Sequence, residues 1–177
     1  MLKRVPVFVC ILVVTLAICT SARAQSQTAA DLPQRLQPPA SEQLLFQVHA
    51  KGDQIYICQE GATQFGWALK APDAQLFDKD GKPFGKHYAG PTWEAADGST
   101  VKGKAAANAP SPDADSIPWL LVSVIERGGK GVLSPVTSIQ RINTKAGKPP
   151  ATGCDSTHAG REQRVPYEAD YVFYAPK

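Results

Sequence analysis

Residues 74–103 read AQLFDKDGKPFGKHYAGPTWEAADGSTVKG and contain two Asp-Gly dipeptides, at 80–81 and 97–98. Each dipeptide stands between two short segments with apolar residues. Asp-Gly favours tight hairpin turns because it accepts the positive φ angles that these turns require. This segment therefore predicts antiparallel strands joined by short turns, over residues 74–77, 84–88, 92–95 and 100–103.

The residues before this segment continue the β pattern. Residues 44–50 and 55–58 are rich in apolar side chains, and Gly52-Asp53 between them indicates a turn. Residues 44–59 are therefore predicted to form a hairpin. Residues 66–69 predict another short strand.

The residues after it also favour strands. Residues 105–116 are rich in Ala, Pro, Ser and Asp and predict a loop, whereas the nearly continuous apolar run 117–125 is typical of a strand buried on both faces. Residues 134–144 include the β-branched Val136, Thr137, Ile139 and Ile142 and are assigned to a strand, although Ser134-Pro135 also suits the start of a helix. Apolar and polar residues alternate over 167–174, as in a half-buried strand.

This gives nine or ten short strands with little helix. Such spacing favours an all-β sandwich or barrel, and the two architectures stay open at this point. We expect a single domain over residues 44–177. Residues 25–43, which are polar and carry three prolines, are expected to form an extended, poorly ordered lead-in.

The N-terminus has the pattern of a secretory signal peptide. Lys3 and Arg4 precede an apolar run over 5–18, and Ala22-Arg23-Ala24 supplies small residues for cleavage. We therefore expect a mature chain starting at Gln25, secreted or periplasmic. An alternative is lipidation at Cys19, although the preceding Ile18 is larger than lipoprotein cleavage sites normally have.

Removal of residues 1–24 leaves a neutral chain. Three of the 19 Lys and Arg residues lie in this leader and none of the 16 acidic residues does, so 16 of each sign remain. A neutral domain offers no electrostatic reason to bind nucleic acid or anionic lipid. No second apolar run approaches membrane length, so stable membrane insertion is not expected.

Two cysteines remain after the leader, Cys58 and Cys154, and an oxidising compartment predicts that they form one disulfide. Two buried free thiols are the alternative. Neither cysteine has a second Cys or a His at ligand spacing, and His49, His87 and His158 are far apart in sequence. We therefore predict neither a metal site nor a cofactor.

Four segments occur in a distinctive order: HYAGPTWE at 87–94 followed by DGS at 97–99, IPWLL at 117–121, QRINT at 140–144 after Ile139, and VPYEADY at 165–171. Together they resemble the DUF3455 family of secreted bacterial and fungal proteins. The sequence departs from the family pattern at Lys145-Ala146-Gly147, where a Gly-Gly pair is expected after the threonine. The resemblance implies a secreted domain of uncharacterised function without known catalytic residues.

The cluster of His87, Tyr88, Trp93 and Glu94 is the strongest functional candidate. Aromatic rings cover the apolar faces of a sugar or other small molecule, while a few polar groups fix its orientation. The competing interpretation is structural: Trp93 fills the core and His87 hydrogen-bonds to a backbone carbonyl.

Three functions remain open. A non-catalytic binding module for a carbohydrate or small polar ligand is favoured, because motifs for catalysis are missing from the sequence. A hydrolase with His87 and Glu94 as acid–base partners is the first alternative, and a structural or stress-related surface protein is the second.

Arg141 is expected to enter the interior and pair with Glu94 or Asp170, and Trp67 and Trp119 are expected to lie in the core.

Overall fold

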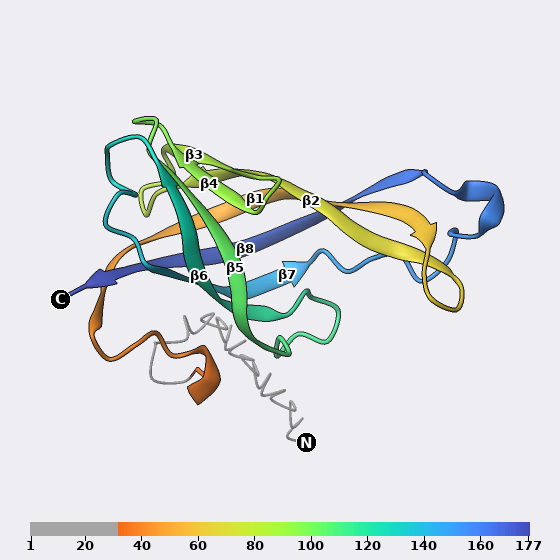
Figure 1. Cartoon of the computed structure of the whole chain (residues 1–177), viewed down its shortest axis with the longest axis horizontal. Helices are drawn as coiled ribbons and strands as arrows, with labels where there is room; N and C mark the ends of the chain where they lie inside the picture. The colour runs from red at the N-terminus through yellow and green to blue at the C-terminus, as the bar shows by residue number, and fades with distance from the viewer. Residues whose placement is uncertain (1–31) are drawn as a thin grey trace, which may run out of the picture.

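A computed structural model of the chain describes residues 32–177, which fold into one closed antiparallel barrel (Figure 1). Each strand pairs with the next in sequence, and the last strand pairs with the first. The all-β prediction is confirmed, with the barrel as the architecture and eight strands in place of nine or ten. The strands are β1 (Glu42–Glu60), β2 (Phe65–Phe77), β3 (Pro83–Tyr88), β4 (Thr92–Ala95), β5 (Thr100–Ala109), β6 (Trp119–Gly128), β7 (Ser138–Ala146) and β8 (Glu162–Pro176).

The hairpin predicted over residues 44–59 is wrong, because these residues belong to the single long strand β1. Gly52 does not turn the chain but pairs with Ala74 of β2. A Cβ atom on Gly52 would lie 2.2 Å from the carbonyl oxygen of Asp73, so glycine lets the two backbones approach closely. The two Asp-Gly turns are confirmed: Gly81 and Gly98 have φ angles of 75° and 82° at the β2–β3 and β4–β5 connections.

The main core lies inside the barrel, where inward-facing large side chains pack beside small ones. The connection between β6 and β7 adds Leu133 and Val136 to this core, both fully buried. It is held by Asp97 and Ser99: the Val132 N–H donates to Asp97 Oδ2 at 2.7 Å, and the Leu133 N–H donates to Ser99 Oγ at 3.2 Å. One end of the barrel is thereby filled.

A second apolar cluster lies on the outside of the sheet, under the short 3₁₀ helix η2 (Gln34–Leu36). Leu32 and Leu36 are buried there, and the Gln140 side chain donates to the Leu36 carbonyl oxygen at 2.6 Å. Residues 32–41 thus differ from the expected poorly ordered lead-in, because their leucines cover apolar groups of the sheet. The predicted signal peptide and residues 25–31 lie outside the described residues.

Burial of β6 on both faces is limited to its first half. Trp119 is buried under η2 and Val122 faces the barrel interior, whereas Ile125 is 58% exposed beyond the helix. Trp119 therefore lies in a core as predicted. Within residues 32–177, no helix has the length and apolarity needed to cross a membrane.

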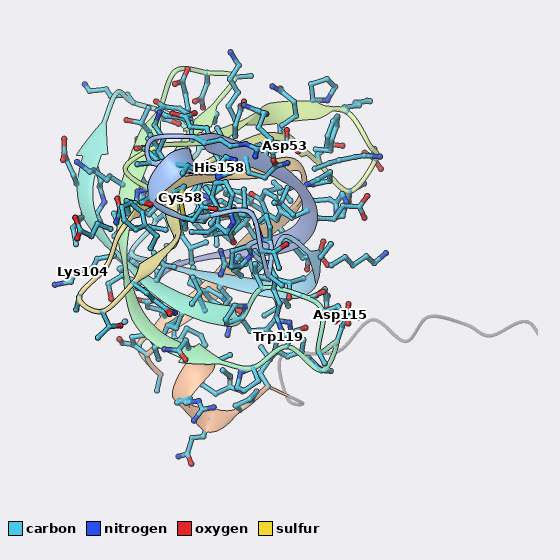
Figure 2. All side chains as sticks on the ribbon, turned by 90° about the vertical axis from the view of Figure 1, so that its right-hand side faces the viewer. Asp53, Cys58, Lys104, Asp115, Trp119 and His158 are labelled. Carbon is cyan, nitrogen blue, oxygen red and sulfur yellow. A yellow bond between two sulfur atoms is a disulfide. The ribbon has the colours of Figure 1, made fainter. Side chains whose placement is uncertain are left out.

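Strands β1, β2 and β8 extend beyond the barrel at one end (Figure 1), and Figure 2 views the molecule from that end. The predicted disulfide between Cys58 and Cys154 lies in this extension, with an S–S distance of 2.08 Å. It ties β1 to the connection that contains the 3₁₀ helix η3 (Ser156–His158). The prediction that Trp67 lies in the core is wrong: Trp67 is partly exposed in this extension. Its indole N–H donates to the Thr152 carbonyl oxygen at 2.9 Å.

The position that departs from the family pattern has an unusual backbone. Ala146 has a φ of 54°, in the left-handed region that favours glycine. We expect Ala146→Gly to raise the free energy of unfolding by about 0.5–1 kcal/mol, because relief of this strain exceeds the entropy cost of glycine. Urea denaturation measures the change. Ala68→Gly, in β2 with negative φ, is the matched control and should destabilise; equal losses in both variants would contradict the expectation.

Candidate ligand-binding site

The β3–β4 hairpin separates the four predicted site residues into two pairs. His87 lies opposite Trp93 in the strand register, and both are buried inside the barrel. Neighbouring residues in a strand point to opposite faces, so Tyr88 and Glu94 face outward. The Tyr88 hydroxyl donates to Glu94 Oε2 at 2.8 Å, which forms a separate contact on the outer face.

Inside the barrel, His87, Trp93 and Tyr171 form an aromatic cluster. The His87 and Trp93 rings stack, with centroids 4.2 Å apart and planes 16° from parallel. Both rings meet Tyr171 edge to face, at 5.0 Å and 5.4 Å. The cluster places a stacked pair of flat rings in the middle of the barrel.

His87 is held as a neutral imidazole. Burial lowers its pKa from 6.5 to about 3, the Thr92 carbonyl acts in the opposite direction, and the positive charge of Arg141 lowers the pKa further. The Nδ1–H donates to the Thr92 carbonyl oxygen at 2.9 Å. The proton therefore sits on Nδ1, and Nε2 carries a lone pair that can accept a hydrogen bond.

A cavity of about 330 Å³ adjoins this cluster. It opens between β2 and β5, because the strands β3 and β4 that join them are short. β2 pairs with β3 only over residues 74–77, and β5 pairs with β4 only over residues 100–102, so the rest of β2 and of β5 have no strand between them here. The lining residues are Gln54, Leu69, Pro72, His87, Pro91, Trp93, Gly103, Lys104, Ala105, Leu120, Val122, Arg141 and Tyr171.

Two buried hydrogen-bond donors of this cavity have no partner among residues 32–177. They are Trp93 Nε1 and Gln54 Nε2, on side chains that are 2% and 1% exposed. Buried polar groups in folded proteins are almost always hydrogen-bonded. Both nitrogens belong to side chains that line the cavity, and each is itself enclosed, so a bound molecule would have to approach closely to accept from them.

Arg141 enters the interior as expected, but it does not make the expected ion pair. It lies opposite Tyr171 in the register, and its Nε and Nη2 donate to the Pro118 carbonyl oxygen at 3.2 Å and 2.9 Å. Glu94 faces outward, and Asp170 instead accepts hydrogen bonds from His49 and Asn143. A backbone carbonyl therefore takes the place of the predicted carboxylate.

Gly103 makes room for the indole of Trp93. A Cβ atom on Gly103 would lie 2.3 Å from Val122 Cγ1 and 3.1 Å from Trp93 Cζ3. Gly103, Gln54 and Arg141 carry no local sequence signal of a binding site. A polar residue or a glycine at an inward-facing strand position would have indicated a site. Such a position can be recognised only when the strand register is known.

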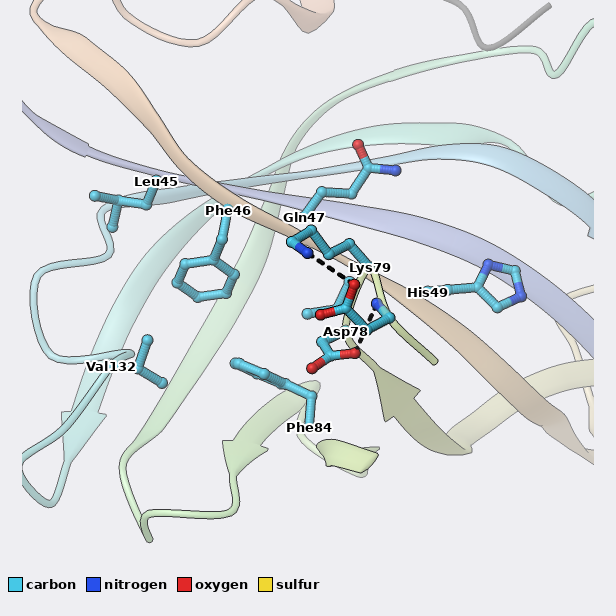
Figure 3. A pocket seen from close by; sticks show the side chains of 10 residues that line it. Leu45, Phe46, Gln47, His49, Asp78, Lys79, Phe84 and Val132 are labelled. Atoms are coloured by element: carbon cyan, nitrogen blue, oxygen red, sulfur yellow. Dashed lines mark hydrogen bonds and ion pairs between the residues drawn. The ribbon is translucent and has the colours of Figure 1, made fainter. Parts of the chain in front are cut away.

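A larger open hollow lies at the filled end of the barrel. Its volume is about 840 Å³, and Figure 3 shows Phe46, Phe84 and Val132 around it. Phe46 packs against Phe84 and Phe173, and the Asp78 carboxylate accepts hydrogen bonds from the backbone of its own turn. Since none of its lining residues has an unpartnered buried donor or acceptor within residues 32–177, the barrel cavity is the better candidate site.

The three histidines do not converge. His49 hydrogen-bonds to Asp170 on the outer face, while His87 is inside the barrel. His158 of η3 hydrogen-bonds to Asp155, with 2.8 Å between Nδ1 and Oδ1. In the described part of the chain, no group of three His, Cys, Asp or Glu side chains is placed to hold a metal ion.

Comparison with known proteins gives one result. No curated protein and no solved structure matches the chain. Residues 39–175 match DUF3455, a family described as "Protein of unknown function". This match covers all eight strands of the barrel except the last residue of β8. The chain therefore belongs to the DUF3455 family.

Proposed function

We propose that this protein is a non-catalytic binding domain that holds one small molecule inside its barrel. The observation that carries the proposal is the cavity of about 330 Å³ beside His87 and Trp93, with two buried donors that have no partner within residues 32–177. An unpaired buried donor costs about 1–3 kcal/mol, so a ligand acceptor that reaches it gains a corresponding advantage. Eight-stranded barrels have interiors of the right width to hold one small ligand.

The predicted ligand-binding set changes with this geometry. His87 and Trp93 stay in the proposed site, and Gln54, Arg141 and Tyr171 join them as lining residues. Tyr88 and Glu94 leave it, because they face the outer surface and bond to each other. The cavity volume is at the lower end of the range for ligand pockets, about 300–1,000 Å³, which favours a molecule with one ring or a short chain.

The two alternative functions receive less support. A hydrolase that uses His87 and Glu94 needs both groups on one substrate, and the two side chains lie on opposite faces of the hairpin. A purely structural surface protein predicts no concave site near Trp93, in conflict with the cavity there.

The compartment supports capture of a ligand outside the cytoplasm. The Cys58–Cys154 disulfide is consistent with an extracellular protein, since such bonds persist in oxidising environments. Together with the signal-peptide pattern at residues 1–24, it favours a secreted or periplasmic binding protein.

The test is a thermal-shift screen of the purified protein against sugars and small organic molecules. Ligands that raise the melting temperature are titrated against wild type, Trp93→Phe and the matched control Trp67→Phe. Trp93→Phe keeps a ring but removes the buried N–H, so we expect affinity to fall about fivefold to a hundredfold, with little change in the control. Equal affinity for all three proteins would contradict binding in this cavity.

A further inference from the structure

We infer that the ligand of the barrel cavity is a small organic carboxylate with an apolar body, and that Arg141 binds its carboxylate group. The inference rests on the proposed function and specifies the ligand class for the same cavity. Three observations support it: the sign of the charges, the unused donors of Arg141, and the kind of polar groups nearby.

The charged residues that line the cavity are both basic. Arg141 lies inside and Lys104 at the rim, where its side chain is exposed, and no Asp or Glu lines the cavity. The neighbouring acids are paired on the outer surface: Asp73 with Arg164 at 2.6 Å, and Asp170 with His49 at 3.0 Å. The cavity therefore carries a positive charge without an opposing carboxylate among its lining residues.

Arg141 has N–H groups that no residue among 32–177 occupies as an acceptor. A guanidinium group has five N–H bonds: the Pro118 carbonyl oxygen receives those of Nε and one on Nη2, and the Tyr171 hydroxyl also interacts with the guanidinium, which leaves two N–H bonds for a ligand. No carboxylate among residues 32–177 forms an ion pair with Arg141. The planar fork of arginine matches the two oxygens of a carboxylate, and such charge-assisted hydrogen bonds are stronger than neutral ones.

The charge of Arg141 acts on the interior groups around it. Burial raises the pKa of Tyr171, and Arg141 counteracts part of that rise. It acts on the pKa of Tyr167 in the same way, where burial is again the main cause of the increase. The guanidinium of Arg141 is therefore close enough to the interior groups to interact with a charge placed among them.

The remaining polar groups suit the oxygens of an anion. Gln54 Nε2 and Trp93 Nε1 are donors without a partner within residues 32–177. The other walls are apolar, from Leu69, Leu120 and Val122, and they match a hydrocarbon or aromatic body. Aromatic or alkyl carboxylates combine these two requirements in one small molecule.

The test compares 3-phenylpropionate with its neutral analogue 3-phenylpropanamide by isothermal titration calorimetry. Wild type should bind the carboxylate at least about tenfold more tightly than the amide. Arg141→Gln should weaken carboxylate binding by about tenfold to a hundredfold. Amide binding should weaken several-fold less than carboxylate binding, because the amide carbonyl can accept a hydrogen bond from the guanidinium but makes no ion pair with it. The matched control Arg161→Gln replaces an exposed arginine beside η3 and should change neither affinity.

The outcomes separate the two proposals. If wild type binds both compounds equally, or if Arg141→Gln weakens both equally, the carboxylate inference is overturned while binding in the barrel stands. If neither compound nor any member of the thermal-shift panel binds at millimolar concentration, the proposed function fails as well.

A second variant keeps the test decisive if Arg141→Gln does not fold. Arg141→Lys retains the charge but loses the planar fork, so the carboxylate should bind about three- to tenfold more weakly, with amide binding unchanged. Unchanged carboxylate affinity in Arg141→Lys, with no decrease at higher salt, would overturn the inference.

Discussion

Replacement of Cys58 and Cys154 by alanine is expected to lower the free energy of unfolding by about 4–5 kcal/mol. The bonded residues are 96 positions apart, so the disulfide closes a long loop and removes much of the conformational freedom of the unfolded chain. Urea denaturation of the oxidised wild type and the double variant measures this difference.

The native barrel should survive the change. The disulfide lies in the extension of β1, β2 and β8, and backbone hydrogen bonds of Cys58 with Gly160 and Arg161 hold the same connection. Reduced wild type serves as the matched control and should behave like the double variant. A loss below about 1 kcal/mol would contradict the loop-entropy argument.

Acid is expected to destabilise the protein through His87. Its pKa is about 3 in the folded protein, below the value of 6.5 in the unfolded chain, so between these values the unfolded chain binds the additional proton. The stability is fully present above pH 6.5 and is lost as the pH falls toward 3. One such group gives a slope of about 1.4 kcal/mol per pH unit in this range.

The comparison of wild type with His87→Asn isolates this contribution. Asparagine does not titrate, and its amide N–H can donate to the Thr92 carbonyl oxygen in place of Nδ1. The slope of unfolding free energy between about pH 6 and pH 4 should therefore decrease by about 1 kcal/mol per unit in this variant. Equal slopes in wild type and His87→Asn would contradict burial of a neutral imidazole.

The strand content and the turns are predictable from sequence because their causes are local. Asp80-Gly81 and Asp97-Gly98 adopt turns that their own backbone preferences favour. Gly52-Asp53 carries a similar signal, yet the chain continues straight, since the glycine accommodates the neighbouring strand β2. A glycine needed for close approach and a glycine needed for a turn look the same in one sequence.

The choice of barrel over sandwich depends on contacts between the chain ends. Pairing of β1 with β8 closes the sheet, and it joins residues as distant as Glu42 and Pro176. No local pattern encodes such a pairing. The burial of Leu32 and Leu36 is hidden for the same reason, because their partners on the sheet are distant in sequence.

The candidate site was half predictable. His87 and Trp93 were identified because aromatic and titratable groups cluster in one segment. The sequence does not show that alternation turns Tyr88 and Glu94 to the other face, since the inward register of β3 and β4 is set by the closed sheet. Gln54 and Arg141 join the site from β1 and β7, far away in the chain.

The most direct test of binding inside the barrel follows the three indole N–H signals by NMR during titration with 3-phenylpropionate. Trp93→Phe assigns the signal of Trp93, whose N–H has no partner within residues 32–177. The account predicts that this signal shifts in a saturable manner, while those of Trp67, bonded to Thr152, and Trp119, buried under η2, stay in place. An unchanged Trp93 signal while the other two move would contradict it.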